Sequence, residues 1–294
     1  MSIRIEQIRE INREKMVPLL KLCFEKESFL DMLHSPNLQV AYAAYCEEEL
    51  QGIIIAWVNT FHPHCMYVRL HSNPLYPEKE IQEKLFAILH DKIDSPLQTS
   101  IWETAVGLRS FYKSIGFKEI RRTYMPVISV KTKIPFITAN ADRFVVKSMG
   151  ELVKNRLLFH KLITLVKRNY EHTHLDNPVA EMEDNSWGKM ITADDVILDG
   201  SFIGLDTAEK NILAYSFLHT SEKKDTAELG WVGVHSPEAN TLLRSLVFQQ
   251  IKYAEKHNVQ FIEGEFDTTD ECAMSLLKVI PVSPSPAWIT YRKE

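Results

Sequence analysis

Three glutamates of this chain lie where acid–base chemistry could use them. Glu228 is at the start of an apolar, β-rich run, and Glu263 and Glu265 follow on the next predicted strand. A period of two places Glu263 and Glu265 on one face of that strand. A carboxylate beside an amine can take its proton, directly or through water. For each of these glutamates, a solvated carboxylate at a strand end is the commoner interpretation.

Two short histidine segments contain residues of the metal-binding type. They are His62-Pro63-His64-Cys65 and His172-Thr173-His174 with Asp176. A zinc site normally needs four ligands, and neither segment has a second ligand pair at metal spacing. Loop histidines are therefore the simpler interpretation, and we expect no metal. His219 and His235 end predicted strands and are further candidates for a base, although a structural role is the simpler expectation.

The glutamates belong to a pattern of alternating strands and helices over residues 226–282. Residues 227–235 are apolar and β-rich, and residues 260–266 alternate like a second strand. Asp270 can cap a following helix that runs to Ile280. Helical spacing of apolar residues between the two strands is seen at Leu242, Leu243, Leu246, Val247, Ile251 and Ala254. A strand, a helix and a parallel strand form a crossover unit, which predicts an α/β fold.

This order of elements resembles the GCN5-related N-acetyltransferases (GNAT), which move an acyl group from coenzyme A to an amine. In that family a glycine-rich loop opens the long helix, and its backbone N–H groups hold the pyrophosphate of the cofactor. Asp270-Glu271-Cys272-Ala273 and Leu276 match the spacing of the family's short-helix motif. The resemblance implies acetyl-CoA as co-substrate, with the backbone of Val232 and Val234 along its pantetheine arm.

The phosphate loop departs from the family pattern. Counted from the proline, residues 240–245 stand where the family has its basic residue and glycines. Leu243 has a Cβ where close backbone approach favours glycine, whereas Arg244 and Ser245 could contact a phosphate. The cofactor-binding residues that the resemblance implies are Val232, Val234, Asn240, Thr241, Leu242, Leu243, Arg244, Ser245 and Asp270.

Two catalytic residues follow from the same resemblance. Glu228 lies where the family often keeps a glutamate that acts on the amine through water. Tyr112 falls at the position of the tyrosine that commonly protonates the departing thiolate, and Leu277 stands there in the later copy of the motif. Tyr112 is also compatible with a core residue whose hydroxyl reaches the surface. Solvent can protonate a thiolate, so a missing tyrosine does not exclude transfer.

The same plan occurs earlier in the chain. Residues 65–71 predict a strand, Pro74 leads a loop into a helix, and residues 97–102 predict a second strand. Residues 111–117 (FYKSIGF) are the clearest family match. The copies are roughly 150 residues apart, which indicates an internal repeat. The loop of this copy, residues 77–82, carries two carboxylates beside a proline and is a poor anion site, so we expect the later copy to bind coenzyme A.

We therefore predict two tandem GNAT-like acyl-CoA N-acyltransferase domains, each a twisted mixed α/β (α+β) sheet flanked by helices. The boundaries are an N-terminal domain over 1–132, structural or degenerate, a linker over 133–143 and a C-terminal domain over 144–294. Residues 287–292 should close the second sheet.

Composition limits the class of protein. The chain has 294 residues, 45% of them hydrophobic and 25% charged, with a net charge of −5. This charge gives no reason to expect a nucleic acid or a membrane as partner. The N-terminus lacks a signal-peptide core, and four scattered cysteines suit a reducing, cytoplasmic setting. The acceptor, a small-molecule or peptide amine, and the oligomeric state stay open.

Two hypotheses remain from the sequence. In one, the protein is an N-acetyltransferase whose second domain binds acetyl-CoA. In the other, it is a catalytically inactive GNAT-fold binding or regulatory module. Leu243→Gly separates them, because a phosphate loop should tolerate this substitution and a core helix should be destabilised by it.

Overall fold

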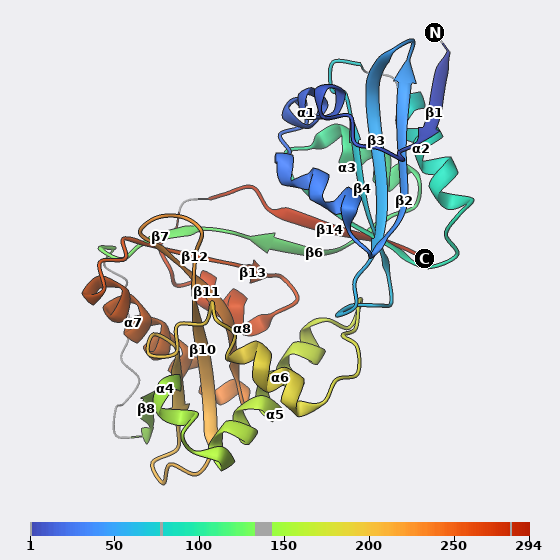
Figure 1. Cartoon of the computed structure of the whole chain (residues 1–294). Coiled ribbons are helices and arrows are strands. Elements are labelled where there is room, and N and C mark those ends of the chain that lie inside the picture. The colour runs from blue at the N-terminus through green and yellow to red at the C-terminus, as the bar shows by residue number, and fades with distance from the viewer. Residues whose placement is uncertain (1, 77–78, 133–142, 283) are drawn as a thin grey trace. The chain divides into compact units, whose positions relative to one another are not determined.

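The computed structural model describes residues 2–76, 79–132, 143–282 and 284–294 (Figure 1). These residues form two compact units. The first contains the chain up to Ile120 together with Asp176–Ala180 and Ile289–Glu294, and the second contains Arg121–Leu175 and Glu181–Trp288. Two late segments of the sequence thus complete the first unit. The predicted linker, except for Arg143, lies outside the described residues.

The first unit is built on an antiparallel sheet with one parallel addition. Its elements are β1 (Ile3–Gln7), α1 (Arg13–Leu22), η1 (Glu27–His34), β2 (Leu38–Cys46), β3 (Glu49–Val58), β4 (Met66–Ser72), α2 (Lys79–His90), β5 (Leu97–Trp102) and α3 (Val106–Ser114). The next strand, β6 (Lys118–Tyr124), begins in the first unit and continues into the second, which starts at Arg121. Strands β1 to β4 pair antiparallel in sequence order, and β4 pairs parallel with β5.

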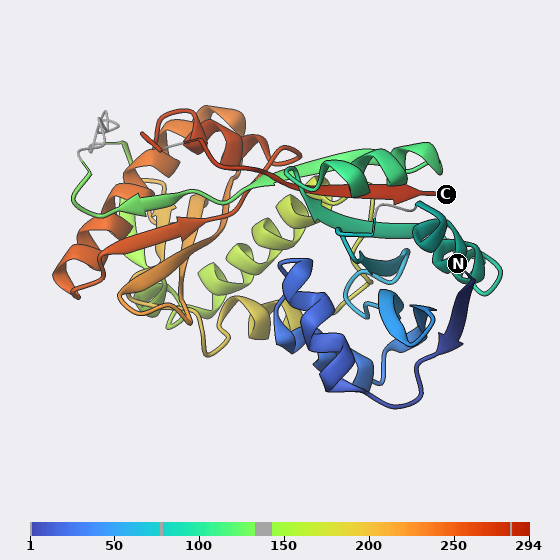
Figure 2. The same cartoon turned by 90° about the horizontal axis from the view of Figure 1, so that it is seen from above.

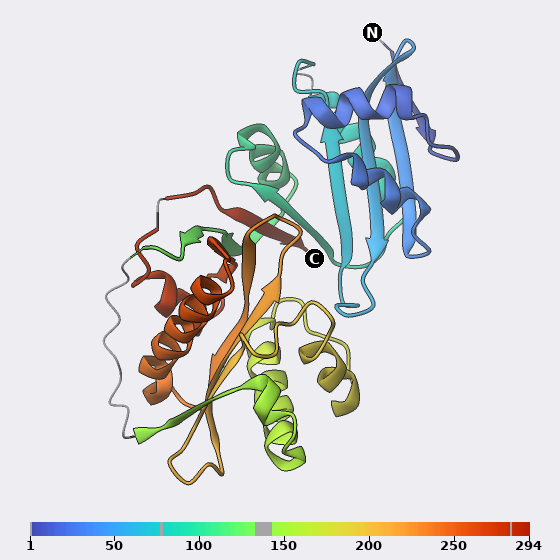
Figure 3. The same ribbon diagram turned by 60° about the vertical axis from the view of Figure 1, so that its left-hand side comes forward.

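Helices cover both faces of this sheet. Successive residues of β3 point to opposite faces, and nearly all of them are buried. Ile53 and Ile55 face the cluster made by α1 and η1. Gly52 has the opposite orientation, and a Cβ there would meet Ile81 and Leu85 of α2. Figure 3 shows α1 crossing the face of the blue strands. Both faces of β3 are buried, so its sequence is almost continuously apolar.

The second unit repeats the same plan. Its elements are β7 (Val127–Ser129), β8 (Val145–Ser148), α4 (Met149–Leu152), α5 (Arg156–Thr173), α6 (Asp184–Ile191), β9 (Phe202–Leu205), β10 (Ile212–Thr220), β11 (Thr226–Val234), η3 (Pro237–Ala239), α7 (Asn240–Lys256), β12 (Phe261–Gly264), β13 (Phe266–Asp267) and α8 (Glu271–Leu277). The strand order of its sheet is β7-β12-β11-β10-β9-β8. Figures 2 and 3 show α7 and α5 on opposite faces of the β10–β11 pair.

The crossover predicted over residues 226–282 is confirmed. Strand β11 pairs parallel with β12, and α7 connects them. Asp270 caps α8 as expected, because its Oδ1 accepts a hydrogen bond from the Ala273 amide at 3.0 Å. The helix ends at Leu277, three residues before the predicted Ile280.

The last strand differs from the expectation. Strand β14 (Trp288–Lys293) does not close the second sheet; it lies in the first, whose order is β1-β2-β3-β4-β5-β14-β6-β13. Ile289 and Tyr291 are fully buried, and the Thr290 hydroxyl lies 3.0 Å from that of Ser100 on β5. The segment is a strand, as predicted, but the local sequence does not say which sheet the strand joins.

Candidate active site

Strands β11 and β12 separate part of the way along β11. Parallel pairing joins Thr226–Leu229 with Phe261–Gly264, and β12 ends there while β11 continues to Val234. Beyond Leu229, β12 no longer covers this edge of β11. The separation creates an open strand edge next to the start of α7.

The peptide groups of Val232 and Val234 face this open edge. The His235 amide donates to the Leu213 carbonyl of β10 at 2.8 Å. Alternate residues of an antiparallel pair turn their peptide groups toward and away from the partner strand, so Val232 and Val234 turn theirs away from β10. The Val234 carbonyl accepts from Asn169 Nδ2 at 3.2 Å. Arg168 also donates to this carbonyl, and the Val234 backbone hydrogen-bonds the Cys272 thiol, so an added chain that pairs with β11 through amide groups would use Val232.

A β-bulge marks the point where the edge opens. Gly230 and Trp231 of β11 stand opposite the single residue Phe217 of β10. One extra residue reverses the alternation of side chains. Leu229 and Val232 therefore both lie in the core under α7, although they are three positions apart. Trp231 faces the opposite side of the sheet, toward α5.

The start of α7 is a core element and not a glycine loop. Leu242 and Leu243 are 3% and 0% exposed, and Leu242 packs where a Cβ on Gly204 would lie. Their side chains cannot reach a bound phosphate, so any contribution from these two predicted residues is through the backbone. Thr241 is exposed, and Asn240 begins the helix after the η3 turn. The N-cap position, Ala239, supplies no capping side chain to the first N–H groups of the helix.

Two arginines supply positive charge on this side of the unit. Arg244 lies about one turn into α7 and is half-buried. Arg168 of α5 donates from Nη2 to the carbonyls of Val234 at 3.4 Å and His235 at 3.0 Å. Ser245 Oγ is buried and has no hydrogen-bond partner among the described residues. Arg168 is a residue that sequence reasoning missed, because it precedes the loop by a whole helix and three strands.

The start of α8 is attached to the start of α7. The Cys272 thiol donates to Asn240 Oδ1 at 3.6 Å, and burial raises the pKa of Cys272 to about 11. Burial also raises the pKa of Asp270. Because Asp270 Oδ1 already caps α8, the structure gives this predicted cofactor residue a helix-capping role.

The structure separates the predicted glutamates by their partners. Glu263 is neutralised by Lys223, whose Nζ lies 2.6 Å and 2.8 Å from its two carboxylate oxygens. Glu228 accepts a hydrogen bond from the Ser221 hydroxyl at 2.7 Å and lies on the α5 face of β11, opposite the core. Glu228 is therefore the better placed of these two to meet an amine.

Glu265 lies just beyond the end of β12, where the two strands separate. Partial burial, and to a smaller extent repulsion from Asp267 and Glu228, holds the pKa of Glu265 above its usual range. The carboxylates of Glu228, Glu265 and Asp267 therefore lie close enough to repel one another, and the region is negatively charged. A cationic amine would be attracted to this region of the α5 face.

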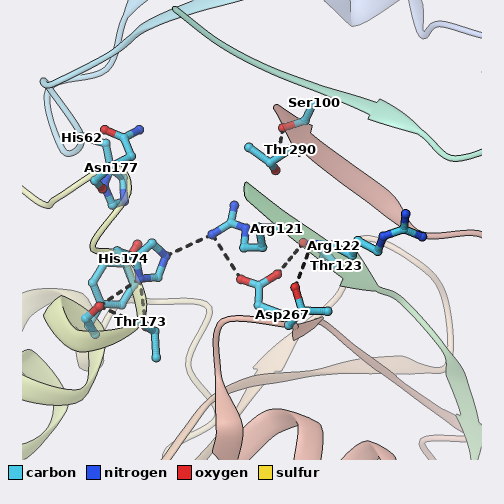
Figure 4. A network of polar contacts seen from close by, with 12 residues as sticks. His62, Ser100, Arg121, Arg122, Thr123, Thr173, His174, Asn177, Asp267 and Thr290 are labelled. Carbon is cyan, nitrogen blue, oxygen red and sulfur yellow. Dashed lines mark hydrogen bonds and ion pairs between the residues drawn. The ribbon is translucent and has the colours of Figure 1, made fainter. Parts of the chain in front are cut away.

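A polar network adjoins these carboxylates (Figure 4). Arg121 Nη1 lies 3.3 Å from Asp267 Oδ2 and 3.3 Å from His174 Nε2. The Tyr170 carbonyl is 2.9 Å from His174 Nδ1, so that nitrogen carries the proton and Nε2 accepts from Arg121. Thr123 Oγ1 also donates to Asp267. Asp267 is therefore occupied, which leaves Glu228 and Glu265 for an incoming group.

Aromatic rings line the same face. The ring centroid of Tyr170 lies 4.9 Å from that of Trp231 and 4.0 Å from that of His174, with which it stacks. Trp187 of α6 is fully buried behind them, 6.2 Å from Trp231. Such a surface can pack against an apolar or cationic group.

Tyr112, the predicted acid, belongs to the first unit. Its ring is fully buried and packs against Phe117 at 5.0 Å and Phe111 at 5.7 Å. The hydroxyl lies beside Thr99 and the Leu70 backbone, and burial raises the pKa of Tyr112 to about 12. This position fits the core interpretation better than an acid. In the second unit the corresponding Leu277 packs against the core.

The strands of the first unit also separate, but the gap is filled. Strands β4 and β5 pair over only two positions, the second being Tyr67 with Gln98. Asn177 Nδ2 donates to Tyr67 Oη at 3.0 Å and to Gln98 Oε1 at 3.1 Å, and its carbonyl accepts from His62 Nδ1 at 2.8 Å (Figure 4). The segment 176–180, which we call the strap, therefore closes the place where β4 and β5 part.

The first unit holds a charged cluster that sequence reasoning missed. Glu25 Oε2 lies 3.0 Å from Arg69 Nη1 and 3.3 Å from His71 Nε2. Burial alone would raise the pKa of Glu25, but the hydrogen bond from His71, the Lys26 amide and the charge of Arg69 outweigh it and lower the value to about 2. The alternation of Arg69 and His71 along β4 was visible in the sequence, but Glu25 on a distant turn gave no signal.

Neither histidine segment forms a metal centre in the described residues. His62 and His174 bind backbone carbonyls, and within the described ranges no group of three or more histidine, cysteine or acidic side chains could hold an ion. Over the same ranges, none of the helices combines the length and the apolar character needed to cross a membrane.

Comparison with known proteins identifies the fold. No family model and no curated protein sequence matches the chain. A GCN5-related N-acetyltransferase of Sphaerobacter thermophilus superposes with a TM-score of 0.63 at 11% identity, over 99% of this chain and 95% of that one. A tandem GNAT protein from the clavulanic acid biosynthesis pathway gives 0.62 at 13% identity, over 100% and 98% of the two chains.

A third structure, the GCN5-related glucosamine N-acetyltransferase region of a fungal multi-domain GH3 β-N-acetylglucosaminidase, gives a TM-score of 0.69 at 10% identity. It covers 99% of this chain and 38% of that one. The chain therefore has the tandem GNAT fold, and the fold class expected from the sequence is confirmed. At these identities the likeness concerns the fold alone.

Proposed function

We propose that the second unit is an acyl-CoA-dependent N-acyltransferase that transfers an acetyl group from acetyl-CoA to an amine. The observation that carries this proposal is the open edge of β11, where Val232 and Val234 turn their peptide groups away from β10 beside the start of α7. An extended, amide-bearing ligand can pair with such an edge, and pantetheine has that chemistry.

The residues around this edge fit coenzyme A. The first N–H groups of α7 suit the pyrophosphate, and Arg244 and Arg168 add positive charge on two helices. Leu243 and Ser245 stand at the glycine positions of the family loop, but the Leu243 side chain is in the core and the Ser245 hydroxyl is buried, so both leave the helix N-terminus uncrowded. Glu238 is the one unfavourable charge of that turn. A hydrogen bond from Ser236 lowers its pKa and keeps it ionised.

The α5 face supplies the chemistry for the amine. Glu228 takes the proton of the ammonium group, directly or through water, and the free amine attacks the thioester carbonyl carbon. A C–N bond forms and the C–S bond breaks, and in this proposal the N–H of Val232 stabilises the developing oxyanion. The thiolate takes its proton from solvent, because Leu277 stands where the family has a tyrosine.

The first unit acts as a scaffold in this proposal. Tyr112 and Asn177 fill the region between β4 and β5 from within the unit, so an acyl chain has no open strand edge there. The two domains of the sequence prediction thus take different roles.

The test combines binding and turnover. Acetyl-CoA binding is measured by calorimetry, and CoA release is followed with spermidine, tyramine, glucosamine and a lysine-containing peptide. Glu228→Gln should lower kcat by about 10²-fold or more while acetyl-CoA still binds. Glu263→Gln is the matched control, because Lys223 already neutralises Glu263. If acetyl-CoA binds but none of the amines causes CoA to be released, the catalytically inactive module is favoured. The missing glycines of the loop support that alternative.

A further inference from the structure

We infer that His219, held by Asp195, is a second proton carrier that takes the amine proton on from Glu228 and delivers it to solvent. This inference rests on the proposed acyl transfer in the second unit. It adds two residues to the reaction that neither the motifs nor the fold comparison assigns.

A hydrogen bond to Asp195 fixes the orientation of the His219 imidazole. His219 Nδ1 lies 2.9 Å from Asp195 Oδ2. A carboxylate only accepts, so Nδ1 carries the proton and Nε2 is left as an acceptor. The hydrogen bond from His219 lowers the pKa of Asp195, so the carboxylate stays ionised. The His219 side chain is 23% exposed and that of Asp195 is 59% exposed, so the pair extends from the sheet face to water.

Nε2 of His219 lies against the backbone of Gly230. A Cβ built on Gly230 would be 2.3 Å from both Nε2 and Cδ2 of His219. The free edge of the ring therefore covers the bulge residue, next to the position where β11 leaves β12. A side chain at position 230 would displace the ring.

The His219 ring and Glu228 lie on neighbouring strands and on the same face of the sheet. His219 and Glu228 are direct cross-strand partners in the β10–β11 register. Directly opposed residues of an antiparallel pair have Cβ atoms about 4.5–5.5 Å apart, on one face of the sheet. The Ser221 hydroxyl holds one oxygen of Glu228 at 2.7 Å. Asp195 and Glu228 are the charged groups that face His219 from the preceding loop and from β11.

The proton balance is simple. The ammonium group gives one proton to Glu228, a water molecule carries it from Glu228 to His219 Nε2, and the imidazolium releases it to solvent. After the attack the nitrogen loses a second proton to solvent, and the departing thiolate gains one. Each turnover thus releases one proton overall and restores both side chains.

The test measures kcat, KM and acetyl-CoA affinity from pH 5.5 to 9, using the panel amine that wild type acylates fastest. His219→Gln should lower kcat by about 10²-fold and leave acetyl-CoA affinity unchanged. Added imidazole should restore part of the activity of His219→Ala. Asp195→Asn should lower kcat by about tenfold or more with KM and acetyl-CoA affinity unchanged, because an amide can donate to Nδ1 and so favours the wrong tautomer of the imidazole. His257→Gln, a surface histidine bonded to the Tyr253 carbonyl, is the matched control.

Gly230→Ala tests the same geometry without removing a titratable group. It should lower kcat by about tenfold or more by displacing the ring, whereas Gly107→Ala, where a Cβ meets nothing within 4 Å, should not. Thermal melts separate these effects from unfolding.

A folded His219→Gln with kcat within twofold of wild type overturns the inference and leaves the proposed function intact. A wild-type chain that binds acetyl-CoA but acylates none of the amines overturns both.

Discussion

Glu25 has the most strongly displaced carboxyl pKa in the first unit, because Arg69 and His71 stabilise its ionised form. Its pKa falls from about 4.3 in an unfolded chain to about 2 in the folded one. A depressed carboxyl pKa contributes stability that is present above the unfolded value and is lost as pH falls through the folded value.

Glu25→Gln should therefore lower the free energy of unfolding at pH 7 by about 2 kcal/mol. The difference from wild type should shrink as pH falls from about 4.3 toward 2. Urea unfolding at several pH values measures it. Glu27→Gln, in an exposed pair with Arg13, should cost less than about 1 kcal/mol. An equal cost of Glu25→Gln at pH 7 and pH 3 would contradict this account.

At the residue scale, local motifs in the sequence predicted the strand positions and the helix cap of individual residues. Glu228, Val232 and Val234 lie on the strand expected of them, and Asp270 caps its helix. Asp195 and Asn177 gave no signal, because each meets its partners only through the tertiary fold.

At the element scale, α7 illustrates the difference between a motif position and its environment. Its apolar periodicity predicted a buried face, and the family alignment predicted a phosphate loop over the same residues. The structure supports the first for Leu242 and Leu243. The bulge of β11 could not be predicted, because Gly230 and Trp231 continue an ordinary strand pattern and the extra residue appears only against β10.

Leu243→Gly should lower the free energy of unfolding by about 3–5 kcal/mol, since it removes a buried side chain and adds the backbone entropy of glycine. Thr241→Gly, at an exposed position of the same turn, should cost about 1 kcal/mol or less. Chemical denaturation of both variants provides the comparison. A stable Leu243→Gly that binds acetyl-CoA more tightly would mean that this turn is a phosphate loop after all.

At the scale of the whole molecule, the two units are not consecutive lengths of chain. The strap and residues 289–294 complete the first unit from late in the sequence. The repeat was visible because each copy carries its own crossover, whereas the destination of β14 depends on pairing over a long sequence separation.

A fragment of residues 1–132 should therefore fail to fold stably. It lacks Asn177, which binds Tyr67 and Gln98, and it lacks the buried Ile289 and Tyr291 of β14. Circular dichroism during heating should show no cooperative transition. Residues 284–294 fused through a flexible linker should restore part of it. A sharp transition of the unmodified fragment would show that the first unit folds without β14.

The central claim is that acetyl-CoA binds the second unit along β11 and α7. Calorimetric titration with acetyl-CoA tests it most directly, on wild type, on Arg244→Glu and on Lys84→Glu, whose lysine lies on the equivalent helix α2 of the first unit. The account predicts micromolar binding that Arg244→Glu weakens by about tenfold or more and that Lys84→Glu leaves within twofold. Absence of binding at millimolar acetyl-CoA, or a loss confined to Lys84→Glu, would contradict it.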